Sequence, residues 1–120
     1  MNRALIGMHD VHLREYFAKH FRDKGYEVET TGNFSEMRKL AETNTHRVYF
    51  MDINLGLPNV GTCAPAEEIY GVVRSRVEKN DAFFFSFSAN DVAVRLAQSK
   101  RIPASDKNNM KEILDFLRKT

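Results

Sequence analysis

Strand-like and helix-like segments alternate five times along this chain of 120 residues. Because such alternation favours a parallel sheet with helices on both faces, joined by right-handed crossovers, the sequence predicts a single α/β domain over residues 1–120. Each expected strand is a short run rich in apolar or β-branched residues, followed by apolar residues at helical spacing. The expected strands are residues 4–8, 26–30, 47–52, 81–89 and 101–105.

Capping signals mark the ends of the first two expected helices. Asp10 is a candidate N-cap for a first helix that ends before Gly25, since glycine is a common helix terminator. Asn33 and Glu36 form a capping-box-like start for the second helix. These signals place both helices directly after the first two strands.

The middle of the chain contains a long connection. Residues 53–64 hold glycine, proline and asparagine and are expected to form a loop, after which Pro65 suits the first turn of a third helix. Apolar residues at helical spacing predict two further helices near residues 92–97 and 110–117. Pro103, within the last expected strand, favours an edge position for that strand, because proline cannot donate a ladder hydrogen bond.

Composition and charge exclude several classes of protein. The formal net charge is +2 and the Lys and Arg residues are scattered, so no nucleic-acid-binding stripe is expected. The single cysteine, Cys63, excludes a disulfide within the monomer and indicates a reducing compartment. No apolar run is long enough to span a membrane, and the N-terminus is too polar for a signal peptide. The sequence therefore predicts a cytoplasmic protein with no membrane or nucleic-acid partner.

Polar residues follow four of the expected strands. His9 and Asp10 follow the first, Asp52 ends the third, Ser88 ends the fourth and Lys107 follows the fifth. In open parallel sheets, ligands bind outside the carboxyl ends of the strands, at the point where the strand order reverses. We therefore expect a carboxylate, a hydroxyl and an ammonium group to meet at one edge of the sheet.

This pattern, Asp52 after strand three, Ser88-Ala89 after strand four and Lys107 after strand five, resembles the receiver domain of bacterial response regulators over essentially the whole chain. The resemblance implies a flavodoxin-like (CheY-like), doubly wound (βα)5 sandwich with a five-stranded parallel sheet in the order 2-1-3-4-5. It also implies that Asp52 accepts a phosphoryl group, with Lys107 pairing a phosphoryl oxygen and Ser88 donating a hydrogen bond to another.

The resemblance further implies a signalling function in a two-component phosphorelay. A sensor histidine kinase or a phosphotransfer protein would supply the phosphoryl group, in a transfer that the domain itself catalyses. The Asp52 carboxylate would attack phosphorus and form an acyl phosphate that hydrolyses slowly. The added charge of about −1.5 to −2 would change a protein-binding face made by helix four, strand five and helix five, and so a downstream effector would respond.

Several positions depart from the family pattern. Met8 and His9 stand where the family has the acidic pair that holds Mg²⁺ together with the phosphoacceptor. Methionine offers no oxygen ligand, so Asp10, Asp52 and Asn54 remain as the candidate magnesium ligands, while a protonated His9 could supply part of the missing positive charge. Ala104 replaces an aromatic switch residue, Asn108 replaces a proline, and the loop after Asp52 is longer than usual.

These departures support an alternative function. In a pseudo-receiver, Asp52 and Lys107 would form a permanent ion pair and the domain would be a constitutive protein-interaction module without phosphorylation. A flavin-binding electron carrier of the same fold is disfavoured, because the loop after the first strand lacks a Ser/Thr/Gly-rich phosphate cradle.

The remaining reactive and aromatic residues have structural interpretations. Cys63 is expected to be a loop thiol, and the aromatic residues of the fourth strand are expected to form core. Three further histidines are expected at the surface: His12, His20 and His46.

Overall fold

Five parallel strands form one sheet in the computed structural model, which describes residues 2–57 and 60–120. The strand order is β2-β1-β3-β4-β5, as the sequence predicts. The elements are β1 (Arg3–Gly7), α1 (Val11–Asp23), β2 (Glu27–Thr31), α2 (Phe34–Glu42), β3 (Val48–Asp52), α3 (Ala64–Glu78), β4 (Phe83–Ser88), α4 (Asp91–Ser99), β5 (Ala104–Asp106) and α5 (Met110–Lys119).

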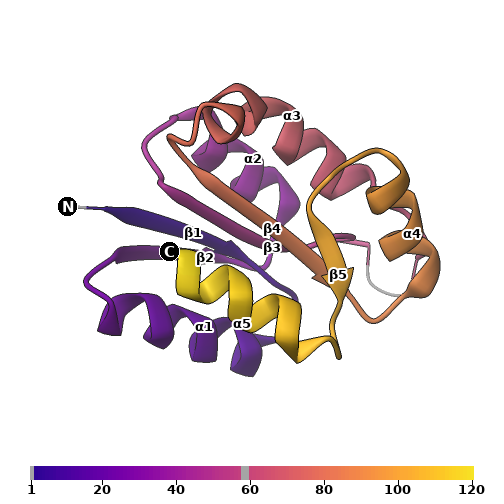
Figure 1. The fold of residues 1–120 in the computed structure, drawn as a ribbon, viewed down its shortest axis with the longest axis horizontal. Helices are drawn as coiled ribbons and strands as arrows, with labels where there is room; N and C mark the ends of the chain where they lie inside the picture. Colours follow the sequence, from indigo (N-terminus) through magenta and orange to yellow (C-terminus); the bar gives the residue numbers. More distant parts are fainter. Residues whose placement is uncertain (1, 58–59) are drawn as a thin grey trace.

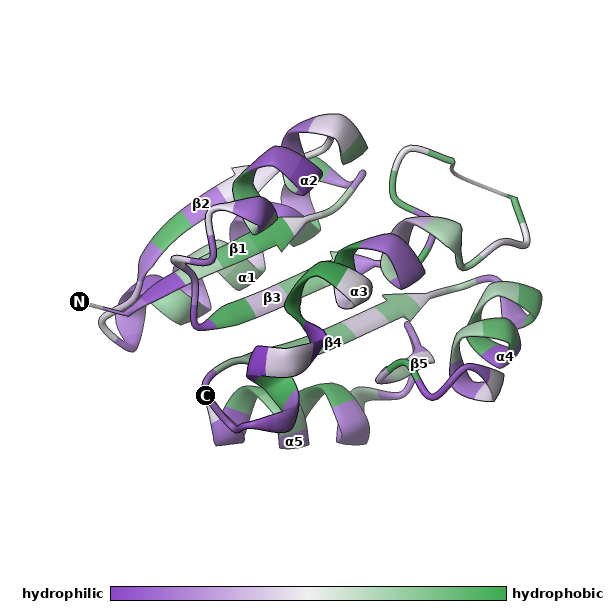
Figure 2. Cartoon of the chain, turned by 90° about the horizontal axis from the view of Figure 1, so that it is seen from above, coloured by the Kyte–Doolittle hydropathy of each residue, from purple (hydrophilic) through white to green (hydrophobic). Residues whose placement is uncertain are grey.

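The helices cover both faces of the sheet. Helices α1 and α5 lie on one face, and α2, α3 and α4 lie on the other (Figure 1). Strands β1 and β3 lie at the centre and are largely hydrophobic along their length (Figure 2). This arrangement is the CheY-like flavodoxin fold, and it places the carboxyl ends of all five strands at one edge.

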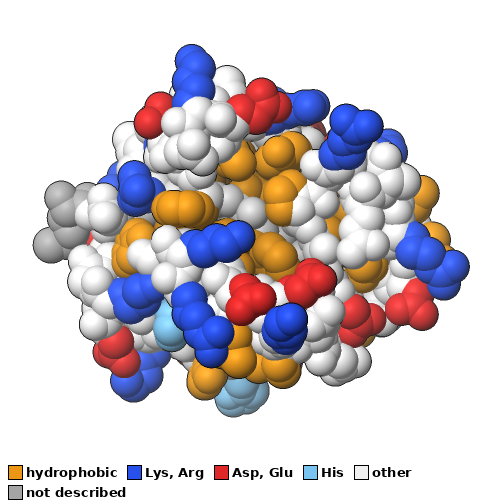
Figure 3. All heavy atoms as spheres, in the orientation of Figure 1, with side chains coloured by type: hydrophobic (Ala, Val, Ile, Leu, Met, Phe, Trp, Pro, Cys, Tyr) orange, Lys and Arg blue, Asp and Glu red, His pale blue; other side chains and the backbone are white. Residues whose placement is uncertain are grey.

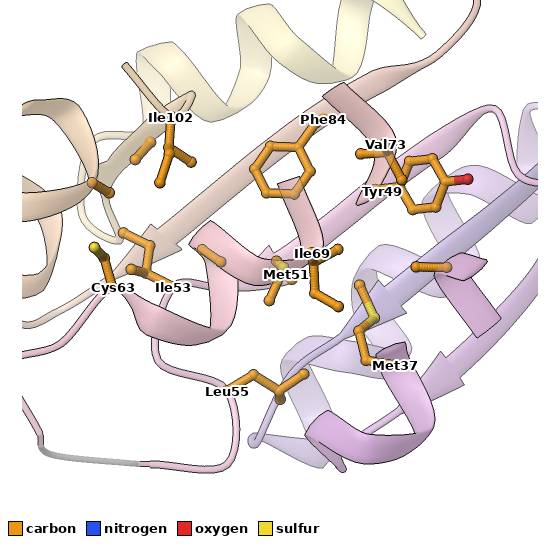
Figure 4. Packing of buried hydrophobic residues seen from close by; sticks show 14 of the residues in the cluster. Met37, Tyr49, Met51, Ile53, Leu55, Cys63, Ile69, Val73, Phe84 and Ile102 are labelled. Atoms are coloured by element: carbon orange, nitrogen blue, oxygen red, sulfur yellow. The ribbon is translucent and has the colours of Figure 1, made fainter. Parts of the chain in front are cut away.

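Alternate residues of the central strands supply two cores. On β3, Tyr49 and Met51 face α2 and α3, whereas Val48 and Phe50 face α1 and α5. Figure 4 shows the first of these cores, in which Met51 lies beside residues from the surrounding helices and loops. Because β3 is buried on both faces at every position, its last residue, Asp52, ends inside the protein and not on its outer surface.

The second core is built around the fully buried Phe50 ring. Phe50 stacks on Phe87 at a centroid distance of 5.1 Å and on Phe116 at 5.7 Å, and it meets Phe17 edge-on at 4.7 Å. These four rings come from β3, β4, α5 and α1, so one aromatic cluster fixes both helices against the sheet. The prediction that the aromatic residues of the fourth strand form core is confirmed.

Side-chain caps begin four of the five helices. The Asp10 carboxylate accepts hydrogen bonds from the backbone N–H groups of His12 and Leu13, at 2.9 and 3.0 Å. Asn33, Asn90 and Asn109 cap α2, α4 and α5 in the same way. Helix α3 has no such cap and instead carries Pro65 in its first turn, as the sequence predicts.

The fifth strand begins later than the sequence predicts. It was expected over residues 101–105, but it comprises only Ala104–Asp106, paired with Ser86–Ser88 of β4. Pro103 lies just before it; its carbonyl accepts the Ser86 N–H at 3.1 Å, but it has no N–H to continue the ladder. The expected edge position of this strand is confirmed.

Two further expectations concern buried residues. His46 was expected at the surface, but it is fully buried between Glu29 and Tyr49, so that prediction is wrong. The sequence around it is polar, and the burial arises from contacts with distant elements. Cys63 lies near the end of the predicted loop, but it is 3% exposed and packs in the core, and burial raises the pKa of its thiol. Residues 58–59 of that loop lie outside the described residues.

Charged side chains of both signs are interspersed on the face shown in Figure 3. Among the helices that the structure describes, none is long and apolar enough to cross a lipid bilayer.

Candidate functional site

A cavity of about 330 Å³ lies at the carboxyl end of the sheet. It is the place where the sequence predicted that polar strand-end residues would meet, and it brings together residues that are up to 98 positions apart, from His9 to Lys107. Its lining residues are His9, Asp52, Asn54, Ser88, Ala89, Asn90 and Lys107.

Asp52 is the buried acid of this cavity. Its side chain is 3% exposed, and its Oδ2 accepts a hydrogen bond of 2.7 Å from the backbone N–H of His9. The same oxygen lies 2.9 Å from Nδ1 of the His9 ring. Two donors of one residue therefore hold one carboxylate oxygen, which leaves Oδ1 as the oxygen that faces Lys107.

His9 is held from both sides of its ring. Its Nε2 accepts a hydrogen bond of 2.7 Å from the backbone N–H of Gly56, in the loop after β3. An accepting Nε2 carries no proton, so Nδ1 carries the ring proton and donates it to Asp52. This arrangement fits a neutral imidazole. It does not fit the protonated His9 that the sequence suggested as a source of positive charge, because a proton on Nε2 would face the Gly56 N–H.

Lys107 supplies the positive charge of the cavity. Its Nζ lies 3.6 Å from Oδ1 of Asp52 and 5.3 Å from the centroid of the Phe87 ring. The Lys107 backbone N–H donates to the Ser88 carbonyl at 2.9 Å, which fixes the chain just after β5. The lysine is therefore positioned by the β4–β5 pairing as well as by its ionic partner.

Ser88 lines the same cavity. Its Oγ accepts the Asn90 N–H at 3.0 Å, and within the described residues it makes no hydrogen bond to Asp52. Ser86, a serine two positions earlier, donates to the Pro103 carbonyl at 2.8 Å and belongs to the sheet. Of these two serines, Ser88 is thus the one beside the acid and the lysine.

The candidate magnesium ligands are divided between two places. Asp52 and Asn54 line the cavity, but Asp10 lies outside it as the N-cap of α1. The hydrogen bond from the Leu13 N–H is the main cause that lowers the pKa of Asp10, which matches a capping role. Asn54 donates its side-chain amide to the Val60 carbonyl at 3.2 Å.

These residues do not fit a magnesium ion. Mg²⁺ requires near-octahedral oxygen coordination, whereas Met8 is 1% exposed and packs into the core, and His9 presents an N–H to Asp52. Within the described residues, no three His, Cys, Asp or Glu side chains are grouped so that they could hold a metal ion.

The sequence analysis missed Asn90, which lines the cavity, and Gly56, which donates a hydrogen bond to His9. Gly56 lies in the loop after β3. It adopts a φ of +86°, a left-handed conformation that glycine accepts without strain, and this turn points its N–H at His9. The glycine in the loop after Asp52 was a visible signal for a tight turn, but nothing in the sequence indicates that the turn reaches the end of β1.

Comparisons with known proteins show the fold. No family model matches the chain, and no curated protein is significantly similar to it in sequence. Among solved structures, it is similar to the non-phosphorylated receiver domain of HemR from Leptospira biflexa, with a TM-score of 0.69 and 22% sequence identity. That match covers 99% of this chain and 93% of the HemR chain.

Two structures of the chemotaxis response regulator CheY4 of Vibrio cholerae are also similar, each with a TM-score of 0.63. They are 18% and 17% identical to this chain, and each match covers 99% of it and 98% of the CheY4 chain. The resemblance drawn from strand-end residues is therefore confirmed at the level of the fold, which is that of a receiver domain.

Proposed function

We propose that this chain, which has the receiver fold, is a receiver-type signalling module that binds a partner protein without phosphorylation of Asp52. The observation that carries the proposal is the double hydrogen bond from His9 to Oδ2 of Asp52. Because His9 donates twice to Oδ2 and Lys107 lies beside Oδ1, the acid is satisfied by the protein itself.

The charges of the cavity support this function. Asp52 contributes one negative charge and Lys107 one positive charge, and the neutral form of His9 contributes none. The pair is therefore balanced without a metal. An incoming phosphoryl donor would meet a carboxylate that has Lys107 beside it but no divalent cation to offset the charge of the transition state, and such a loss costs orders of magnitude in rate.

Exposed apolar side chains on α4 and α5 support protein binding. On α4, Val92 is 54% exposed and Leu96 is 39% exposed, and on α5, Met110 is 51% exposed and Leu114 is 43% exposed. These two helices flank β5. Together, α4, β5 and α5 make the face through which, by the resemblance to receiver domains, the protein is expected to bind its partners. We propose that a signalling protein, the downstream effector of the sequence analysis, binds this face.

Resistance to phosphorylation is tested directly by intact-mass measurement at neutral pH. The protein is incubated with acetyl phosphate and Mg²⁺, beside the Asp52→Asn variant and beside a receiver that has a complete acidic pair. We expect no phosphoryl adduct on this chain and a clear adduct on the complete receiver. A substantial adduct that disappears in Asp52→Asn would overturn the proposal.

A phosphorylation-dependent switch is the second candidate function, and one observation favours it. Asp52, Ser88 and Lys107 line a single cavity, so an acid, a hydroxyl and an amine are available together. In that function a sensor histidine kinase or phosphotransfer protein would phosphorylate Asp52 by a route that requires no magnesium ligand from positions 8 and 9. A phosphoryl adduct formed equally with and without Mg²⁺ would support it.

A further inference from the structure

We infer that His9 is a positioning residue that couples Asp52 to the conformation of the loop after β3. This inference deepens the proposed function and rests on it in one respect: Asp52 is taken to be the unphosphorylated carboxylate that His9 holds. The coupling is a chain of two hydrogen bonds, from Gly56 N–H to Nε2 of His9 and from Nδ1 of His9 to Oδ2 of Asp52.

The two hydrogen bonds depend on each other through the tautomer of the ring. A carboxylate accepts hydrogen bonds and cannot donate them, so Asp52 favours the tautomer of His9 with the proton on Nδ1. That tautomer leaves a lone pair on Nε2, 2.7 Å from the Gly56 nitrogen. If Asp52 loses its acceptor oxygen, the proton is free to occupy Nε2, and the Gly56 N–H then loses its partner.

The backbone N–H of His9 separates the position of the residue from the orientation of its ring. It donates to the same Oδ2 at 2.7 Å and so fixes the position of the residue independently of its ring. The His9 side chain is 28% exposed, so neither its hydrogen bonds nor its orientation is forced by complete burial. The ring orientation is therefore set by Asp52 and Gly56.

Gly56 passes the effect on to an apolar region. A Cβ atom placed on Gly56 would lie 3.3 Å from Cβ of Phe34, the first residue of α2, so the glycine packs closely against that helix. A second cavity, of about 310 Å³, opens here and is lined mostly by apolar residues that include Phe34, Leu55 and Leu57. A shift of Gly56 changes the shape of this cavity.

On the β5 side of the site, Lys107 is the direct contact, because its Nζ lies 3.6 Å from Oδ1 of Asp52. Ala104 of β5 is 9% exposed and has no side chain beyond Cβ that could change position, and the Ser88 Oγ is held by the Asn90 N–H. A change at Asp52, by substitution or by a phosphoryl group, therefore reaches the loop after β3 through the two hydrogen bonds of the His9 ring.

Nitrogen NMR of the unmodified protein tests the first half of the inference. We expect ¹⁵N shifts of His9 that report a protonated Nδ1 and a bare Nε2, and a coupling across the hydrogen bond between Nε2 and the Gly56 amide. A His9 ring with its proton on Nε2, or without that coupling, would overturn the inference. This measurement requires no variant to fold.

Amide hydrogen exchange of variants tests the second half. In Asp52→Leu, which removes the acceptor and keeps the branched arrangement of heavy atoms, we expect the Gly56 amide to exchange about two- to tenfold faster, the factor expected for losing one ordinary hydrogen bond. The same change is expected in His9→Phe, while replacement of the exposed His12 of α1 in His12→Ala leaves it unaltered. Exchange at β3 amides shows that each variant is folded.

An unchanged Gly56 amide and an unchanged tautomer in Asp52→Leu would contradict the coupling. Failure of the coupling and failure of the proposed function are separate results, because the coupling is measured on unphosphorylated protein. A phosphoryl adduct on Asp52 would overturn the proposed function while leaving the hydrogen-bond measurements valid.

Discussion

The backbone N–H and the ring Nδ1 of His9 converge on one oxygen of Asp52, at 2.7 and 2.9 Å. These residues are 43 positions apart and lie at the ends of neighbouring strands, β1 and β3. A carboxylate that is almost fully buried needs such partners, because an unsatisfied buried charge is strongly destabilising. His9 is therefore expected to contribute to stability as well as to the geometry of the cavity.

Replacing His9 by alanine should destabilise the fold. The variant retains the backbone N–H bond but loses the ring donor to a buried carboxylate, at a cost of about 1–3 kcal/mol in the free energy of unfolding. Urea denaturation measures the change. In the Asp52→Asn background the same replacement should cost less, since the charge that required the donor is gone. Equal costs in both backgrounds would show that the pair is not coupled, and exposed His12→Ala provides the control.

Replacing His9 by aspartate should create a site for a divalent cation. The new carboxylate would lie beside Asp52 and Asn54, so that oxygen ligands replace the N–H group that now faces Asp52. Paramagnetic broadening by Mn²⁺ measures binding. We expect saturable broadening around the cavity in His9→Asp and none in the unaltered protein or in His9→Ala, which opens space without adding oxygen. Equal Mn²⁺ affinity in the unaltered protein and His9→Asp would contradict this account of metal exclusion.

Protonation of His46 should make the fold less stable below neutral pH. Burial is the main cause that lowers its pKa below the ordinary 6.5, against the opposing effect of its hydrogen bond to Glu29. Below about pH 6.5 the unfolded chain therefore binds a proton that the folded chain does not. The contribution of His46 to the free energy of unfolding is therefore fully present above this pH, and it is lost as the pH drops toward the pKa of the folded state.

Urea denaturation between pH 5 and 7 checks this dependence, and His46→Gln, which can still donate to Glu29, should have a flatter pH profile. His20, whose pKa burial also lowers, contributes in the same direction, so some slope remains in that variant. The same slope in the original protein and in His46→Gln would assign the effect to other groups.

Truncation of Phe50 should be the most damaging change in the core on the α1 and α5 side. Phe50 is fully buried and contacts rings from β4 and from two helices, so Phe50→Ala should cost about 3–5 kcal/mol, with a smaller loss for Phe50→Leu. Thermal or urea denaturation measures both. Tyr16→Ala, at a side chain that is 65% exposed on α1, should change stability by less than about 0.5 kcal/mol.

The meeting of Asp52, Ser88 and Lys107 could be predicted because it depends on strand ends, which are local in sequence, whereas the strand order was implied by the resemblance to receiver domains. Because strands and helices alternate, all strands are expected to be parallel, and the residues that follow the strands then lie at one edge of the sheet. The hydrogen bonds within this cluster could not be predicted in the same way. They depend on the position of His9 against Gly56, 47 residues away.

The burial of His46 was missed for a similar reason. Its neighbours in sequence are polar, but Glu29 of β2 accepts its Nε2 hydrogen bond at 2.8 Å, and Arg76 of α3 donates to its carbonyl at 2.7 Å. Both partners come from elements that are distant in sequence. The late start of β5 was missed because Arg101–Pro103 carries an apolar residue that packs in the core without joining the ladder; that residue is Ile102.

The brevity of β5 has a consequence for self-association. A strand of three residues preceded by Pro103 offers few free backbone groups to a second chain, so this border of the sheet is a poor template for aggregation. At the opposite border, β2 carries Glu27 and Glu29, and their like charges disfavour pairing with another copy of itself. We therefore expect concentrated solutions of this protein to resist fibril growth even though the middle of its sheet is rich in phenylalanine.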